Sequence, residues 1–219
     1  PLRGAGIEWS ATGFAPWLAP EDGILTYLIA ASTIPRQDEF KKDWQPSSRS
    51  VAFKRIMWQN VGGYPEWIPY CEDVIFDRKI EKLAGRPAYV REALVFWRPR
   101  LTLRSYIQQL YNYTRSEGHG GLNINRQAIR YLAYGGAIVL LFLGMKFSVG
   151  YLAVLAGGVM LYMLKFWRRS WEFTKEKNIP YRILCLILVP LIVAIGDVGK
   201  MIGFPAGIFE RITYKIYNV

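Results

Sequence analysis

The sequence predicts a mixed α/β domain followed by an all-α membrane region of two to three helices. Up to about Tyr131, short helical and extended segments alternate with Gly and Pro turns. Beyond Tyr131 come three apolar runs with basic and aromatic flanks, which are hard to bury in a soluble chain of 219 residues. We therefore expect a soluble part at 1–130 and a transmembrane or interfacial part at 131–219. A large all-helical soluble core is the alternative.

The net charge of +11 narrows the class of partner. The 28 Lys and Arg residues outnumber 17 Asp and Glu, which suggests a nucleic acid, an anionic membrane surface or a phosphate-bearing substrate. The basic residues flank apolar runs and form no continuous stripe, so we expect membrane lipid and no nucleic acid as a partner. Two cysteines, Cys71 and Cys185, exclude a disulfide scaffold and a four-ligand zinc site, and the single His119 excludes a poly-His metal centre.

Three segments of the first part have a recognisable pattern. Residues 23–33 are apolar but too few to span a bilayer, so they predict a core helix. The β-branched and aromatic residues of 88–97 predict a strand. The segment from Leu103 to Thr114 has the period of a helix, and one side of that helix would carry Tyr106, Leu110 and Tyr113.

The first two apolar runs, 132–144 and 150–164, predict a helical hairpin that crosses or dips into the bilayer. The alternative is one long tilted helix with Lys146 at mid-depth, where a lysine costs roughly 2.5–3.5 kcal/mol. A turn at Lys146 avoids that cost, so the hairpin is preferred.

The third apolar run, 183–195, contains Pro190 and is predicted to end at Gly196-Asp197. Because the run is short and holds a proline, two arrangements stay open: it spans the bilayer or it lies in it. The tail at 198–219 mixes basic and aromatic residues, a composition that suits an interfacial helix.

Basic residues on both sides of the predicted hairpin indicate its orientation. By the positive-inside rule, the soluble part and the loop after the hairpin face the cytoplasm, which places the protein in the cytoplasmic (inner) membrane. The basic residues are Arg126, Arg130, Arg168, Arg169, Lys175 and Lys177, and the expected aromatic belt comprises Tyr131, Trp167 and Trp171.

The residues suited to chemistry lie between Pro46 and Gly85. A polar loop at 47–50 is rich in hydrogen-bond donors, and an apolar Val-Ala-Phe run and a short amphipathic turn at 56–61 follow it. The turn ends at Gly62-Gly63, a pair that permits positive φ and the close approach of a ligand to the backbone.

An acidic pair, Glu72 and Asp73, opens a segment that predicts a helix ending at Gly85. Two explanations of the pair stay open. It caps the helix and interacts favourably with the helix dipole, or it holds a carboxylate on rigid structure, ready to take a proton. One face of the expected helix comprises Val74, Ile75, Ile80 and Leu83.

Taken in order, these motifs resemble the second half of a family 2 glycosyltransferase catalytic domain. The strings SSRSVAFKR, WQNVGGYPEW and CEDVIFDRKIEKLAG match the family's polar loop with Ala-Phe-Lys-Arg, its Gly-Gly turn with Pro-Glu, and its Glu-Asp helix. The resemblance covers roughly residues 13–121 and is specific through the order and spacing of several parts. Trp97-Arg-Pro-Arg100, the segment 108–115 and the Gly-Asp-Val-Gly-Lys-Met string after the last apolar run are similar to the membrane-anchored members.

The resemblance implies the C-terminal half of a GT-A nucleotide-sugar fold. It also implies inverting transfer of a sugar from a nucleotide-diphosphate donor to a lipid-linked or glycan acceptor of the cell envelope, at the cytoplasmic membrane face. Asp73 matches the general base that deprotonates the acceptor hydroxyl, and Glu72 would orient that base or contact the acceptor. Gly62 and Gly63 would line the acceptor site.

Three cationic or titratable residues are further substrate-binding candidates. Arg115 and His119, where the interface helix meets the membrane, are placed to hold the donor diphosphate or a lipid phosphate. The alternatives are simple headgroup contact for Arg115 and a plain polar loop residue for His119. Arg49 in the Ser-rich loop is a donor-side candidate.

The chain also departs from the family pattern. It contains no Asp-x-Asp metal motif, and Asp73 and Asp77 are four apart, a helical spacing. We therefore expect the N-terminal half of the catalytic domain, with the nucleobase pocket and the ligands of a Mg or Mn ion, to be missing before Pro1 or supplied by a separate polypeptide. The alternative is a non-catalytic transferase remnant that serves as a membrane scaffold subunit of a larger complex.

Overall fold

The protein forms two compact units, as a computed structural model that describes residues 6–34 and 46–217 shows. Of the residues described, the first unit draws on 6–21, 33–34 and 46–99, and the second on 22–32 and 100–217. The expected boundary at residue 130 does not follow this division, because two helices that precede it belong to the second unit. These helices are α1 (Ile24–Thr33) and α4 (Leu103–Gly120).

The first unit is built on a three-stranded mixed sheet in the order β2-β1-β3. The central strand β1 (Trp9–Pro16) pairs antiparallel with β2 (Val51–Phe53) and parallel with β3 (Ala88–Trp97). The predicted strand at 88–97 is confirmed, and so is the α/β character of this part.

Two helices, α2 (Arg55–Val61) and α3 (Glu72–Ala84), supply the core of the first unit. Trp9 is buried in that core, and its indole Nε1–H donates to the carbonyl of Gly85, 2.8 Å away, which joins the end of α3 to the sheet. The buried side chains packed together are Trp9, Met57, Phe76 and Ile80.

The face of α3 differs from the predicted one. Leu83, expected on the same face as Ile80, is exposed, whereas Phe76 and Asp77 are buried. The helix therefore presents residues 76, 77 and 80 inwards, and the half-buried Asp73 lies on the same face at the start of the helix, a spacing of three and four that the apolar residues alone did not reveal.

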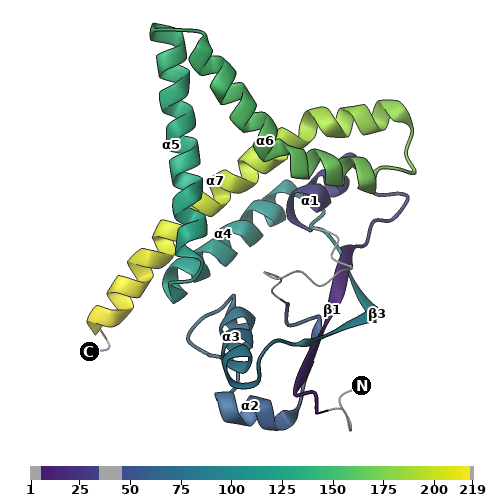
Figure 1. Cartoon of the computed structure of the whole chain (residues 1–219), viewed down its shortest axis with the longest axis vertical. Coiled ribbons are helices and arrows are strands. Elements are labelled where there is room, and N and C mark those ends of the chain that lie inside the picture. Colours follow the sequence, from purple (N-terminus) through teal and green to yellow (C-terminus); the bar gives the residue numbers. More distant parts are fainter. Residues whose placement is uncertain (1–5, 35–45, 218–219) are drawn as a thin grey trace. The chain divides into compact units, whose positions relative to one another are not determined.

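The second unit is helical, and its membrane character is confirmed in coarse form. Three helices are long and apolar enough to cross a membrane, judged over the residues described. In Figure 1, α5 (Ile124–Lys146) and α6 (Gly150–Phe173) form the predicted hairpin, with residues 147–149 as its turn. Lys146 thus ends a helix, and no long helix carries it at mid-depth.

The third apolar run does not end at Gly196-Asp197 as predicted. It belongs to α7 (Ile179–Tyr217), one continuous helix that passes through Pro190 and Pro205 and includes most of the expected interfacial tail. The helix continues through its glycines because they form the contact with α4, which lies alongside α7 (Figure 1). A Cβ added at Gly203 would lie 2.4 Å from the carbonyl oxygen of Tyr111.

α4 is the predicted helix at 103–114, extended to Gly120. Tyr106 and Leu110 are buried as expected, but Tyr113 is exposed and Thr114 takes the next buried position. The predicted core helix at 23–33 is confirmed as α1. Its Leu28 and Ile29 pack in one buried cluster with residues of α4, α6 and α7.

Candidate functional site

The first turn of α3 carries the predicted base. Cys71, in the left-handed region at φ 62°, redirects the chain so that the helix begins at Glu72. Asp73 is half-buried, and its Oδ2 accepts the backbone N–H of Ser48 at 3.1 Å while Oδ1 lies 2.9 Å from the backbone nitrogen of Val74. The carboxylate is therefore held on rigid structure and still reachable from solvent.

The Ser-rich loop meets this carboxylate because its own hydrogen bonds set its shape. The buried Ser50 hydroxyl accepts the Ser47 N–H at 3.1 Å, and the carbonyl of Ser50 accepts the N–H of Thr12 in β1 at 2.8 Å. The loop is thereby fixed to the sheet, and Ser48 at its tip lies against Asp73. Sequence motifs 25 residues apart are brought together at one place.

Arg49 occupies the same loop and is exposed. Its guanidinium carbon lies 5.9 Å from the centroid of the Trp97 ring, a cation–π geometry that orients the side chain. The predicted donor-side role of Arg49 stays a prediction.

The Gly62-Gly63 pair adopts positive φ at both positions, 78° and 73°. Gly62 ends α2 as a left-handed C-cap. Gly63 is required by packing as well, since an added Cβ would lie 2.8 Å from Cζ2 of Trp58. Local structure thus accounts for both glycines, and their place in an acceptor site stays a prediction.

The sequence showed the helical spacing of Asp73 and Asp77 but assigned Asp77 no place in the site. Its side chain is buried at 2% exposure, and neither carboxyl oxygen has a hydrogen-bond partner in the part of the chain described. Burial, followed by the charges of Asp73 and Glu81, raises the pKa of Asp77 to about 8. At neutral pH this carboxyl is therefore mostly protonated, so Asp73 has a largely neutral neighbour one turn along.

Tyr64, in the loop after Gly63, lies near the same acids. Burial raises the pKa of its hydroxyl, and the charges of Asp77, Asp73 and Glu72 add to the rise. The signal for the burial of Asp77 was its place on one helix face with the apolar Phe76 and Ile80, which the spacing to Asp73 alone did not indicate.

Arg115 and His119 lie in α4, in the helical unit, whereas the other candidates lie in the sheet unit. Nε of Arg115 donates to Oε1 of Glu210 at 2.7 Å, and Nδ1 of His119 lies 3.7 Å from Oε2 of the same residue. The hydrogen bond to Glu210 raises the pKa of Arg115. Glu210 thus already supplies one negative charge to both residues. Their contact with a phosphate stays a prediction.

The described residues contain no ligand set for a divalent metal. Over residues 6–34 and 46–217, no group of three or more His, Cys, Asp or Glu side chains is arranged to hold an ion. The Mg or Mn ion expected for a complete enzyme stays a prediction.

Comparison of the chain with protein-family models, with curated proteins and with solved structures finds no match. The family 2 resemblance consequently rests on the quoted motifs and their order.

Proposed function

We propose that this chain is the acceptor-side half and membrane anchor of an inverting glycosyltransferase. The observation that carries the proposal is the placement of Asp73, whose half-buried carboxylate is fixed by Ser48 at the start of α3. A general base must be held within hydrogen-bond reach of the proton it takes, and a helix start braced by a second loop provides that rigidity.

In the proposed reaction, the acceptor hydroxyl attacks the anomeric carbon of a nucleotide-diphosphate sugar. The new C–O bond forms as the bond to the diphosphate breaks, and the hydroxyl proton passes to the carboxylate of Asp73. Attack from the face opposite the leaving diphosphate inverts the anomeric centre. Protonated Asp77 supports this role, because a neutral neighbour adds little repulsion to the charge on Asp73.

Asp73→Asn in the full-length protein tests the proposal. The amide oxygen can still accept the Ser48 N–H, so folding should change by less than about 1 kcal/mol, while loss of a general base lowers transfer by roughly 10²–10⁴-fold. Transfer is measured with radiolabelled UDP-glucose, UDP-N-acetylglucosamine and GDP-mannose, and with a membrane lipid extract as acceptor.

Glu92→Gln is the matched control, because Glu92 is an exposed acid on β3 that the mechanism does not use. Full turnover by Asp73→Asn would remove Asp73 from the base role. Absence of transfer by the wild type from every donor would favour the scaffold-subunit alternative.

A further inference from the structure

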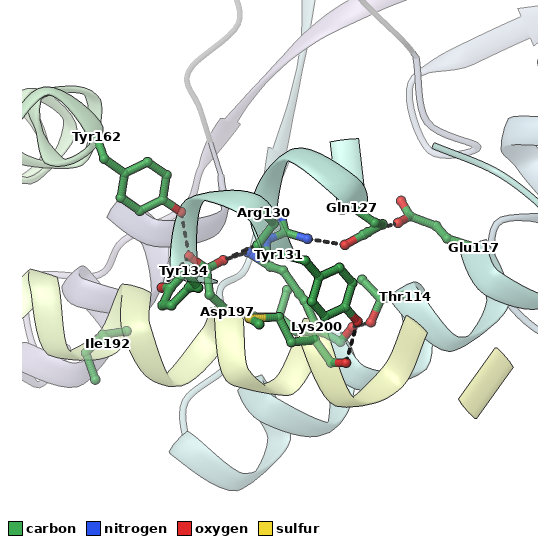
Figure 2. A network of polar contacts seen from close by, with 12 residues as sticks. Thr114, Glu117, Gln127, Arg130, Tyr131, Tyr134, Tyr162, Ile192, Asp197 and Lys200 are labelled. Carbon is green, nitrogen blue, oxygen red and sulfur yellow. Dashed lines mark hydrogen bonds and ion pairs between the residues drawn. The ribbon is translucent and has the colours of Figure 1, made fainter. Parts of the chain in front are cut away.

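A buried carboxylate, Asp197 of α7, lies at the centre of a polar network in the membrane region (Figure 2). Its side chain has 0% exposure. One oxygen lies 3.4 Å from Nε of Arg130 and 3.0 Å from Nζ of Lys200. The other accepts the hydroxyls of Tyr134 at 3.0 Å and Tyr162 at 2.5 Å. Three spanning helices, α5, α6 and α7, thus meet at one group.

The network continues from α5 to α4. Arg130 donates to the side chain of Gln127, whose amide donates to Glu117 at 2.5 Å. Glu117 also accepts from Asn123 at 2.8 Å and forms an ion pair with Arg126. Every oxygen of the two carboxylates is therefore already engaged by at least one protein donor.

Lys165 of α6 lies beside this network. Its ammonium is 4.7 Å from the ring centroid of Phe166 and 5.1 Å from that of Tyr162. It is also close enough to interact electrostatically with charged groups of all three helices, which are Arg169, Asp197, Lys200 and Arg130. The side chain is exposed, and among the residues described no carboxylate lies within ion-pair distance of it. Arg130 and Lys200 also keep some access, with 15% and 20% of their side chains exposed.

The charges in this region do not balance. More cations than carboxylates lie within the network and beside it, so positive charge remains after every ion pair is formed. An uncompensated cation in a spanning helix is costly and marks a functional site by default. The cations are Arg126, Arg130, Lys165, Arg169 and Lys200, and the carboxylates are Glu117 and Asp197.

The cluster lies near one end of the α5–α6 hairpin. Arg130 is six residues into α5, about 9 Å from its start, and Lys165 is eight residues before the end of α6, about 12 Å. Trp167 lies between Lys165 and that end, and its indole donates to the carbonyl of Leu186 at 3.1 Å. Tryptophans of this kind mark the depth of lipid headgroups, where phosphates lie.

We propose that Arg130, Lys165 and Lys200 bind the phosphate group of a membrane lipid. A phosphate provides the missing negative charge and further acceptor oxygens beside carboxylates that protein donors already engage, and exposed Lys165 makes the first contact. The proposal stands on the helical unit alone and does not depend on glycosyl transfer.

Native mass spectrometry of the full chain in a neutral detergent tests the proposal. The protein is titrated with phosphatidylglycerol, with a polyprenyl monophosphate and with inorganic phosphate, so that three sources of the same group are separated. We expect saturable binding of at least one of the two lipids. The lipid that binds more tightly identifies which kind of phosphate the site takes. Binding of inorganic phosphate alone, or of none of the three, would overturn a lipid site.

Lys165→Gln is the informative variant, because its side chain is exposed and holds no carboxylate whose loss would unfold the protein. It should weaken lipid binding about tenfold or more, the effect of one charge-assisted contact, and Lys165→Arg should restore it. Lys175→Gln, at an exposed lysine just after α6, is the control and should cost less than about fivefold. Equal weakening by both glutamine variants would reduce the effect to general surface attraction and contradict a site.

Discussion

The buried carboxyl of Asp77 gives a prediction whose size follows from the structure. Its pKa is raised from 3.8 to about 8 because the charged form has lost its water and gained no hydrogen-bond partner within the described part of the chain. Between those two pH values the unfolded chain releases the Asp77 proton while the folded chain keeps it. The unfolded state then binds fewer protons, so the free energy of unfolding falls as pH rises, by about 1.4 kcal/mol per pH unit.

Asp77→Asn keeps the shape of the side chain and removes this titration. The stability of the variant relative to the wild type should therefore grow between pH 5 and pH 7.5, by up to about 3 kcal/mol. The change with pH is the useful quantity, because the effect of burying an amide is the same at both pH values.

Hydrogen exchange of α3 amides, followed by mass spectrometry on the full chain, measures this difference locally. Comparison of variant and wild type at one pH cancels the intrinsic pH dependence of exchange, and Glu92→Gln on β3 serves as the control. A gain in protection that is equal at pH 5 and 7.5, or absent at both, would refute the assignment of a protonated Asp77.

Two further predictions concern the helical unit. Gly207→Ala would place a Cβ 1.8 Å from the carbonyl oxygen of Arg115, so it should destabilise the α4–α7 contact by about 1–3 kcal/mol or more in detergent unfolding. Gly158→Ala, in open space on α6, should change stability little, and equal effects would contradict the packing argument. Arg115→Gln breaks an exposed pair with Glu210 and should cost less than about 1 kcal/mol. A large loss of sugar transfer with that small loss of stability would support a phosphate-binding role for Arg115. Unaltered transfer would indicate that Arg115 only pairs with Glu210 in the folded structure.

Local pattern was enough to predict the elements whose residues decide their own conformation. The β-branched residues of 88–97 form the expected strand, and the polar residue Lys146 between two apolar runs ends a helix as expected. The acidic pair at Glu72 and the glycine at Gly85 also mark the two ends of α3. In each case the signal lies within a few residues of the feature.

The end of the third apolar run was wrongly predicted for a physical reason. Glycines disfavour a helix by about 1 kcal/mol each in isolation, so Gly196 looked like a stop. In α7 the glycines at 196, 199, 203 and 207 face α4 and allow close backbone contact. The packing energy gained in this contact offsets the unfavourable helix propensity of glycine. That compensation depends on a partner helix about 90 residues earlier in the chain.

The candidate site likewise has features that the local sequence predicted and features that depend on distant parts of the chain. Asp73 was found because it belongs to a local motif, and its hydrogen bond with Ser48 joins two motifs that were recognised separately. The pairing of Arg115 with Glu210 and the network around Asp197 were not predictable from the sequence. Both depend on which face of α7 meets the other helices, and a short motif carries no such information.

The most direct test of the central claim is the initial rate of sugar transfer by full-length Asp73→Asn, relative to wild type and to Glu92→Gln. A catalytic Asp73 predicts a fall of roughly 10²–10⁴-fold for Asp73→Asn with folding retained, and an unchanged rate for the control. A rate for Asp73→Asn equal to that of the wild type would contradict it.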